Sequence, residues 1–390
     1  MLKINPFKPG SPVHPGMFAG RIDEIKKVER ILFQAKKSFA RHFLVYGERG
    51  IGKTSFLQYV KFVAKGLIDV ESQRLRFLVV ETEITKETTR KGLIGKINLN
   101  LKSELGGTEA ARSNFEKLWD FTKRLEACGV KLSKSDDNQE NELLEEEFSI
   151  SLAETIKRIT TPNDSFFSLS ANFDGVLFLF DEVDKANDGL NIGSFFKLLQ
   201  ERLQRRGVEK LVIGISGLPE VFSVLYESHQ SSLRLFEEIP LKRLTRDEIC
   251  YVITKCLKEA KELNSVEMQI TEEGKSYLAA FSEGFPHFIQ QFGHSAFDYD
   301  KDWVLDKTDI INSAFGSGGA LEAIGRVYYK KDFYQKIQSP GYRQVLRIMA
   351  DKMDSWITRK EIKSQFKGTE GVLNNAISAL INRNITACAS

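Results

Sequence analysis

The chain has 390 residues, of which 42% are hydrophobic and 28% charged, and its formal net charge is +3. This length allows two or three domains, and the composition is typical of a globular protein. No apolar run approaches the ~20 residues that cross a bilayer, and residues 1–20 lack the apolar core of a signal peptide. The cysteines have no CxxC spacing, which fits free thiols in a reducing compartment. We therefore expect a cytoplasmic protein without a membrane segment.

The first predicted elements are a buried strand over His42–Tyr46 and a helix that begins at Lys53 and stops near Gly66. A second apolar strand is expected over Arg76–Glu81. Continuous apolar strands of this kind are typical of a parallel sheet that is covered on both faces. Residues 86–172 have mostly helical and polar patterns, so we expect a helical insertion before the next strand.

Two further strands, Val176–Phe180 and Leu211–Ile215, flank a helix predicted over Ser194–Arg206. A short fifth strand is expected near Ile239–Leu241. The alternation of strands and helices predicts a doubly wound α/β domain, which we place over residues 1–244.

The rest of the chain reads as helical. Thr245 and Glu248 form a predicted capping box, which opens a helical region over residues 245–325. Residues 326–390 predict three short amphipathic helices of the winged-helix type. Their apolar positions are Val345, Leu346 and Met349, then Ile362 and Phe366, then Leu373, Ala376, Ile377 and Leu380.

A phosphate-binding loop is predicted between the first strand and the helix that follows it. The pattern G-x-x-x-x-G-K-[ST] is matched by Gly47, Glu48, Arg49, Gly50, Ile51, Gly52, Lys53 and Thr54. Backbone N–H groups of such a loop surround phosphates, and the helix N-terminus adds a partial positive charge. Lys53 is expected to reach the β- and γ-phosphates, and the Thr54 hydroxyl to bind Mg²⁺. The sequence thus predicts ATP, or a closely related nucleoside triphosphate, with Mg²⁺, and the absence of an Asn-Lys-x-Asp motif disfavours a GTPase.

An acidic pair, Asp181 and Glu182, follows the third apolar strand. Asp181 is expected to hold Mg²⁺, through water, and Glu182 to orient and deprotonate the attacking water. The alternative is a surface acidic pair, which the apolar run directly before it disfavours. Glu182 favours hydrolysis over storage of the nucleotide.

Two further candidate catalytic residues, Ser216 and Arg234, each allow two interpretations. Ser216 ends the fourth strand, where its hydroxyl contacts either the γ-phosphate or the attacking water, or simply caps the strand. Arg234 lies before the fifth strand. It is either an arginine finger, which would act on a neighbouring subunit and imply self-association, or a surface or ion-paired arginine, which is slightly favoured.

With these motifs in place, the chain resembles the AAA+/STAND group of ATPases, near the archaeal and eukaryotic origin-recognition initiators. Residues 18–24 resemble the N-terminal F-x-G-R-x-x-E box of that group, which implies that Arg21 lies near the adenine. Residues 47–54 match its Walker A motif and 178–184 its Walker B motif, and Gly214–Gly217 resembles the end of its sensor-1 strand.

Gly284–His287 resembles the G-x-P element of the helical lid, which implies that His287 contacts the nucleotide. Origin-recognition initiators usually carry a lid arginine where this chain has His287, which favours a STAND-like switch. The resemblance implies an α/β fold: a P-loop doubly wound parallel sheet with a helical lid, followed by a C-terminal winged-helix-like all-α domain. Few residues follow the last predicted helix, so we expect either a minimal wing or an incomplete winged-helix domain.

The predicted function is an ATP-hydrolysing switch whose nucleotide state controls the C-terminal domain. In one version that domain binds double-stranded DNA, with Asn374 or Asn375 near base edges and phosphates contacted by Arg359, Lys360, Lys363 and Lys367. In the other version it docks a protein, and its lysines are a solvated face. The basic composition of the C-terminal part favours DNA only slightly.

Overall fold

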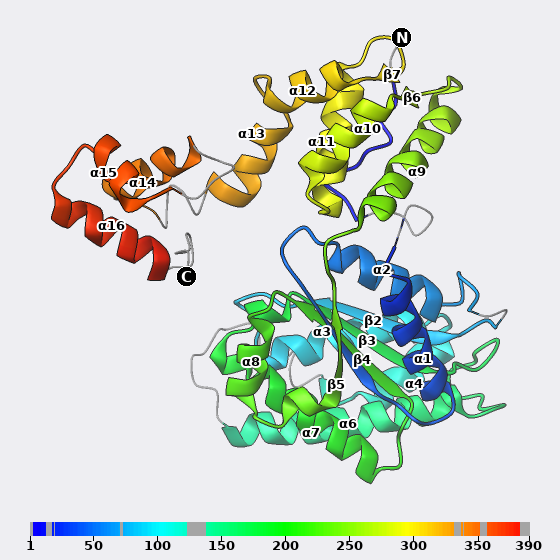
Figure 1. The fold of residues 1–390 in the computed structure, drawn as a ribbon. Coiled ribbons are helices and arrows are strands. Elements are labelled where there is room, and N and C mark those ends of the chain that lie inside the picture. The colour runs from blue at the N-terminus through cyan, green and yellow to red at the C-terminus, as the bar shows by residue number, and fades with distance from the viewer. Residues whose placement is uncertain are drawn as a thin grey trace.

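The computed structural model describes residues 3–12, 18, 20–70, 73–122, 138–330, 337, 339–351 and 357–382. Within these residues the centre of the molecule is a parallel sheet of five strands in the order β2-β3-β4-β1-β5 (Figure 1). The strands are β1 (His42–Tyr46), β2 (Phe77–Glu83), β3 (Gly175–Asp181), β4 (Leu211–Gly217) and β5 (Phe236–Pro240). Each strand predicted from an apolar run is therefore confirmed, with ends that differ by a few residues.

The carboxyl ends of the strands lie together at one edge of the sheet. Tyr46 of β1 is opposite Gly217 of β4, and Glu83 of β2 is opposite Asp181 of β3. The loop that follows β1 and the polar side chains that end the neighbouring strands therefore meet at this edge. Open α/β sheets bind ligands in this position.

Helices cover both faces of the sheet (Figure 1). Two of them, α1 (Ile22–Lys36) and α2 (Lys53–Ala64), pack on one face. The other face is covered by α3 (Arg90–Leu105), α6 (Asn138–Thr160), α7 (Ile192–Arg205) and α8 (Val221–Ser228). Successive residues of β3 alternate between the two cores, with Leu177 and Leu179 on the first face and Phe178 and Phe180 on the second. This two-sided burial explains the continuous apolar runs in the sequence.

The segment between β2 and β3, expected as a helical insertion, packs directly on the sheet. Besides α3 and α6 it contains α4 (Glu109–Leu118). The Trp119 indole donates a hydrogen bond of 3.0 Å to the Thr155 hydroxyl and stacks on Phe115, with ring centroids 5.3 Å apart. These helices share one apolar cluster with β3 and α7.

A helical lid follows β5. It contains α9 (Arg246–Asn264), α10 (Glu272–Ser282), α11 (Pro286–Tyr299), α12 (Lys307–Phe315) and α13 (Ala320–Ile324). The predicted capping box is confirmed, because Thr245 and Glu248 exchange side chain to backbone hydrogen bonds at the start of α9. Two short paired strands, β6 (Gln269–Ile270) and β7 (Val304–Leu305), were not predicted.

The N-terminal segment, residues 3–12, lies along the lid. Its Phe7 is buried against Gly293 of α11, and the Lys8 backbone N–H donates to the Gln290 side chain at 2.8 Å. Further along, Phe18 stacks on Tyr59 of α2, with ring centroids 5.3 Å apart. The N-terminal part of the chain thus contacts both the lid and the helices of the sheet.

The C-terminal unit consists of α14 (Pro340–Ala350), α15 (Arg359–Gln365) and α16 (Glu370–Asn382). Its own apolar cluster includes Val345, Ile362, Leu373 and Leu380, which confirms the amphipathic pattern. The predicted fold class is thus confirmed, and a wing after α16 would fall on residues 383–390, outside the described residues.

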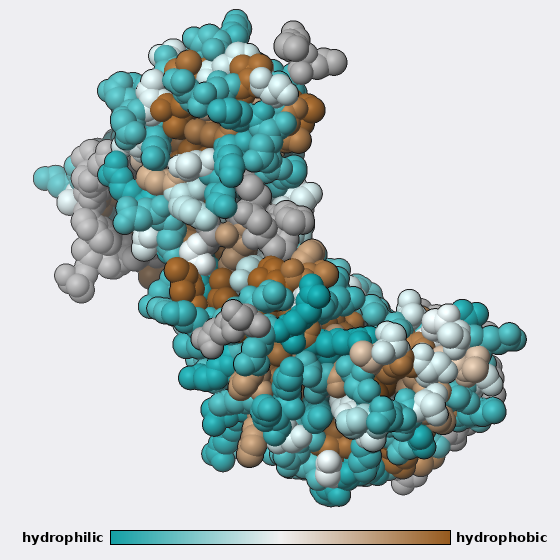
Figure 2. Space-filling model, turned by 90° about the vertical axis from the view of Figure 1, so that its right-hand side faces the viewer, coloured by the Kyte–Doolittle hydropathy of each residue, from teal (hydrophilic) through white to brown (hydrophobic). Residues whose placement is uncertain are grey.

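Among the described residues, no helix combines the length and apolar character that a membrane crossing requires. On the face drawn in Figure 2 the molecule narrows between the sheet and the lid, and apolar surface gathers at this narrow part. The cavity described next lies between the same two parts.

Candidate functional site

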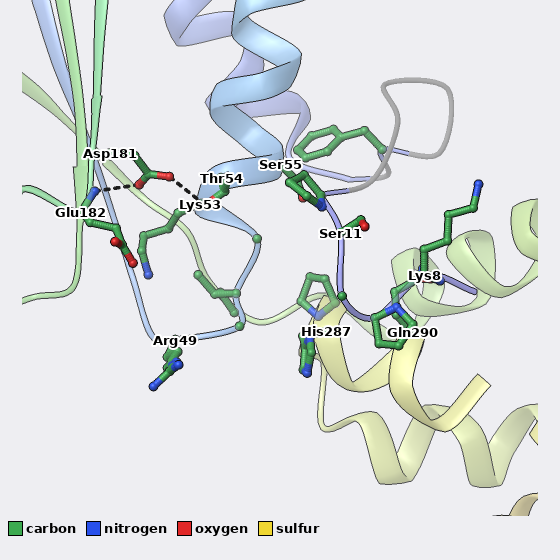
Figure 3. Close-up of a pocket in the computed structure, with 18 of the residues that line it drawn as sticks. Lys8, Ser11, Arg49, Lys53, Thr54, Ser55, Asp181, Glu182, His287 and Gln290 are labelled. Atoms are coloured by element: carbon green, nitrogen blue, oxygen red, sulfur yellow. Dashed lines mark hydrogen bonds between the residues drawn. The ribbon is translucent and has the colours of Figure 1, made fainter. Parts of the chain in front are cut away.

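A cavity of about 600 Å³ lies between the carboxyl edge of the sheet and the lid (Figure 3). Its walls come from the N-terminal segment, the loop 47–54, the end of β3, the start of α11, and residues before and within α9. Phe18, Leu244 and Val252 give it an apolar side, whereas Lys53, Asp181 and Glu182 give it a charged end.

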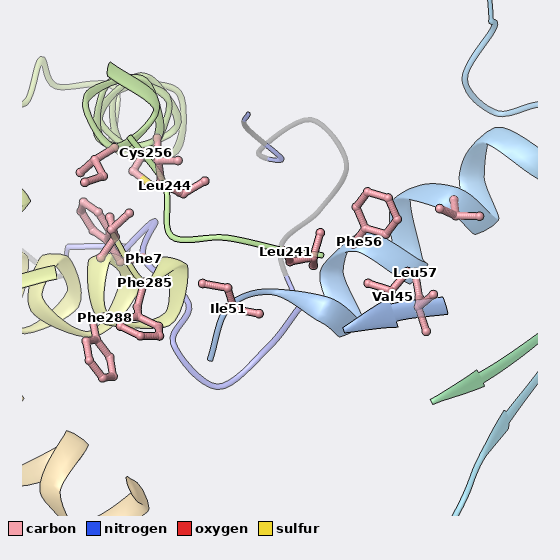
Figure 4. Packing of buried hydrophobic residues seen from close by; sticks show 14 of the residues in the cluster. Phe7, Val45, Ile51, Phe56, Leu57, Leu241, Leu244, Cys256, Phe285 and Phe288 are labelled. Atoms are coloured by element: carbon pink, nitrogen blue, oxygen red, sulfur yellow. The ribbon is translucent and has the colours of Figure 1, made fainter. Parts of the chain in front are cut away.

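The loop 47–54 has a conformation that depends on its glycines. Gly50 and Gly52 have φ of 81° and 96°, in the left-handed region that side chains disfavour. Between them Ile51 is buried in an apolar cluster that runs from β1 and α2 through Leu241 into the lid (Figure 4). The buried Ile51 side chain therefore anchors the loop in the core. The first residues of α2 line the cavity, and a helix N-terminus favours binding of an anion.

The Lys53 ammonium group lies within this loop. Its Nζ donates to the carbonyl oxygens of Gly47 and Glu48 at 2.9 and 3.1 Å. Burial lowers the pKa of Lys53, although the nearby carboxylates of Asp184, Asp181 and Glu182 oppose this effect. The charge of Arg49, which also lines the cavity, lowers this pKa further. Lys53 thus lies near three acidic groups, as a phosphate-binding lysine beside a metal site would.

Asp181 is held by three donors at the end of β3. The Thr54 hydroxyl donates to its Oδ2 at 2.8 Å, and the Glu182 N–H donates to its Oδ1 at 2.8 Å. The buried Ser216 hydroxyl also donates to Oδ1. Ser216 thus fixes the carboxylate of Asp181, and both interpretations of this residue from the sequence stay predictions.

The oxygens of Thr54 and Asp181 are of the kind that Mg²⁺ prefers. No group of three or more His, Cys, Asp and Glu suited to hold a metal is found in the described part of the chain. A divalent cation here would therefore take its other ligands from water and from a bound phosphate, which is the usual way that Mg²⁺ binds.

Glu182 has an unusual backbone and two charged neighbours. Its φ is 59°, a left-handed value that is uncommon for a non-glycine residue and is found at functional sites. Its carboxylate forms an ion pair with Lys185. Burial would raise the pKa of Glu182, but hydrogen bonds with Lys185 and Glu83 outweigh it, so the pKa is lowered. The hydrogen bond with Glu182 correspondingly raises the pKa of Glu83.

Arg21 connects three parts of the site. Its guanidinium Nη2 donates to the Ile51 carbonyl at 3.3 Å, and its backbone N–H donates to Glu248 of α9 at 3.4 Å. Burial lowers its pKa, against the opposing charges of Glu24 and Glu248. Arg21 lines the cavity but also holds the loop in place.

His287 lies at the start of α11 and lines the cavity. Its backbone N–H donates to the Gly50 carbonyl at 3.3 Å. Burial lowers the pKa of its ring, while a hydrogen bond to the carbonyl of Pro9 raises it and the charge of Arg49 lowers it further. The lid therefore touches the loop through this residue.

Arg234 is not brought to the cavity. It is exposed on a 3₁₀ turn, Ser232–Leu235, directly before β5. Because β5 runs parallel to β1, with Phe236 opposite His42, this turn lies at the amino end of the sheet. The loop follows the carboxyl end of β1, so Arg234 and the cavity lie at opposite ends of the sheet. Within the loop, exposed Glu48 forms an ion pair with Arg243 at 3.5 Å.

Several residues at the site escaped the sequence analysis. They are Glu83, Lys185 and Gln290, together with residues 8–12 of the N-terminal segment. Asp184, within the matched Walker B motif, also lines the cavity and accepts a hydrogen bond of 2.9 Å from the Leu218 N–H. Lys185 could have been found from its spacing to Glu182. Glu83 depends on the sheet order, whereas Gln290 and residues 8–12 depend on how the N-terminal segment packs on the lid.

Neither a family model nor a curated protein matches the chain. Solved structures do match. The ORC2 protein of Aeropyrum pernix, in ADPNP–ADP complexes, has 11% identity and a TM-score of 0.50, over 95% of this chain and 88% of that one. Cdc6p from Pyrobaculum aerophilum has 13% identity and a TM-score of 0.45, over 97% and 89%. Drosophila ORC bound to DNA has 14% identity and a TM-score of 0.46, over 96% and 82%.

The fold of this chain is therefore similar to that of the Aeropyrum pernix ORC2 protein. The resemblance seen in the sequence motifs is confirmed at the level of the fold. Within this fold the loop 47–54, the end of β3 and the lid surround one cavity.

Proposed function

We propose that the chain binds ATP with Mg²⁺, hydrolyses it, and uses the nucleotide state to control its C-terminal unit. The observation that carries this proposal is the hydrogen bond of 2.8 Å between the Thr54 hydroxyl and Asp181. It joins the two residues that would hold Mg²⁺, and the ammonium group of Lys53 and the carboxylate of Glu182 line the same cavity beside the glycine-rich loop.

Each residue then has a defined task. The backbone of the loop and the N-terminus of α2 bind the phosphates, and Lys53 exchanges the carbonyls of Gly47 and Glu48 for phosphate oxygens. Thr54 and Asp181 hold Mg²⁺, which offsets the negative charge of the transferred phosphoryl group. The apolar side of the cavity, with Phe18 and Val252, suits a purine ring.

Glu182 accepts the proton of the attacking water. Its lowered pKa keeps the carboxylate ionised at neutral pH, so it can accept a proton, although it is a weaker base than a carboxylate whose pKa lies near the working pH. A general base of this kind contributes roughly 10²–10⁴ in rate. Aeropyrum pernix ORC2, whose fold this chain shares, was solved with ADPNP and ADP, which supports an adenine nucleotide.

For the C-terminal unit we propose double-stranded DNA as the partner. Lys360 and Lys367 are exposed on or beside α15, where phosphates could reach them. One observation favours the alternative, a protein partner. Glu370 forms ion pairs with Arg359 and Lys363, at 3.5 and 2.9 Å, and so neutralises part of the basic surface.

The test is fluorescence anisotropy of a labelled DNA duplex titrated with the Glu182→Gln protein, with and without ATP, at two salt concentrations. This substitution keeps the phosphate-binding residues but removes the base, so that ATP stays bound. Binding that needs ATP and weakens steeply with salt supports the DNA switch, because phosphate contacts release counterions. Absence of binding in every condition, with ATP bound, shifts the proposal to a protein partner.

A further inference from the structure

Tyr328 packs against the loop 47–54 from outside the cavity. It belongs to a π-helical turn, Gly325–Tyr329, directly after α13. A Cβ atom placed on Gly50 would lie 2.6 Å from the Tyr328 hydroxyl oxygen. Glycine at position 50 therefore serves a close approach to Tyr328 in addition to its left-handed backbone.

The Tyr328 ring is enclosed by the loop on one side and the lid on the other. The Arg49 guanidinium lies 5.4 Å from its centroid. The rings of His287 and Phe288, both at the start of α11, lie 5.3 and 5.4 Å away. Burial raises the pKa of Tyr328, so its hydroxyl stays protonated at neutral pH. The neighbouring Tyr329 is 59% exposed.

The turn that carries Tyr328 has a rare geometry. A π-helical turn contains one residue more than an α-helical turn, and such turns are concentrated at functional sites. Here the Lys330 N–H donates to the carbonyl of Gly325, five residues earlier. In the sequence this turn, which contacts the loop 47–54, precedes the C-terminal unit that begins with α14.

We infer that Tyr328 is a positioning residue that links occupancy of the loop 47–54 to the placement of the C-terminal unit. This inference rests on the proposed binding of a nucleoside triphosphate. Phosphate oxygens in the loop attract the Arg49 guanidinium more strongly than an aromatic face does, because charge-assisted hydrogen bonds exceed a partly exposed cation–π contact. Tyr328 then loses its cationic neighbour, and the turn and the helices that follow it take a different position.

The experiment measures one distance in the full chain. Nitroxide labels are attached at Tyr226→Cys on α8 and Val372→Cys on α16, both exposed positions, after replacement of the natural cysteines by alanine. The Glu182→Gln background keeps ATP bound, and calorimetry on the same samples measures ATP affinity. Double electron–electron resonance then reports the distance with and without ATP and Mg²⁺.

We expect ATP to shift the distance distribution in the parent and in Tyr329→Ala, the matched control from the same turn. In Tyr328→Ala the shift disappears while the ATP affinity changes less than about threefold, since Tyr328 lies behind the loop and contacts no ligand. Tyr328→Phe keeps the ring, so we expect it to show the same ATP-dependent shift in distance as the parent. It also serves as the second variant if Tyr328→Ala fails to fold.

The outcomes are distinguishable from a failure of the proposed function. A parent protein that does not bind ATP refutes the proposed function itself. A parent that binds ATP without any change in distance overturns the inference alone. The same holds if Tyr328→Ala, correctly folded, shows the full shift, or if Tyr329→Ala loses it equally.

Discussion

Lys185 forms an ion pair with Glu182, one turn earlier in the chain, at the carboxyl end of β3. The proposed general base is therefore held between a lysine of its own turn and Glu83 of the neighbouring strand β2. Both neighbours lower the pKa of Glu182 against the effect of its burial. The ionised state of the base is thus a property of this small cluster.

Replacing Lys185 with Met should raise the pKa of Glu182. The substitution removes the hydrogen bond that most strongly offsets the effect of burial on this carboxylate. A carboxylate with a raised pKa becomes protonated at higher pH, so the acid limb of the ATPase pH profile moves upward. The measurement is turnover from pH 4 to 8. Lys197→Met, which removes a surface lysine paired with Glu201, is the control. Identical profiles for both variants and the parent would contradict the role of Lys185.

Lys53→Ala should lower ATP affinity at least ~100-fold, because hydrogen bonds between a charged group and phosphate contribute about 1.5–3 kcal/mol each. Titration calorimetry measures this loss. The matched control is Lys61→Ala on the same helix, whose ammonium group pairs with Glu81 away from the cavity. If both variants bind ATP with the affinity of the parent, the loop 47–54 is not the phosphate site.

The buried His42 predicts how stability depends on pH. Ile213 donates its N–H to His42 Nδ1 at 3.1 Å, so the ring must be neutral and use Nε2–H to bind Gln200. Burial lowers its pKa to about 4. The unfolded chain takes up this proton near pH 6.5, so stability is full above that value and falls as pH decreases towards 4.

This loss should reach about 3 kcal/mol, at about 1.4 kcal/mol for each pKa unit. Urea unfolding at pH 7, 6, 5 and 4 measures it. In His42→Gln, whose side chain does not titrate, the decrease between pH 6.5 and 4 should be smaller by that amount. Parallel pH dependence in the two proteins would show that His42 does not carry the effect.

Glu370→Gln should strengthen DNA binding several-fold and steepen its salt dependence. The substitution removes the carboxylate that neutralises Arg359 and Lys363, and more cations then contact phosphates. The control is Glu322→Gln, which removes the carboxylate that forms an ion pair with the exposed Arg326. Equal anisotropy curves for parent and Glu370→Gln would favour the protein-docking alternative for the C-terminal unit.

Elements that depend on neighbouring residues were predictable from the sequence. The strand His42–Tyr46, the loop 47–54 and the helix from Lys53 are encoded within one short stretch, because apolar periodicity and glycine positions act locally. Asp181 is predictable for the same reason, since it ends an apolar strand. Both members of the proposed metal-binding pair, Thr54 and Asp181, are therefore recognisable from their local sequence alone.

What escaped prediction depends on the order of strands and on distant segments. Glu83 meets Glu182 only because β2 pairs with β3, and nothing local in the sequence fixes that pairing. Ser216 turns to Asp181 because β4 lies beside β3. Residues 8–12 reach the cavity by packing along a lid that begins more than 200 residues later.

The lid is joined to the rest of the molecule at two places, through residues 241–245 after β5 and through the N-terminal segment that precedes Phe18. The backbone thus crosses between the sheet and the lid at two separated places along the sequence. Any change in the position of the lid has to be accommodated by the dihedral angles of both of these segments.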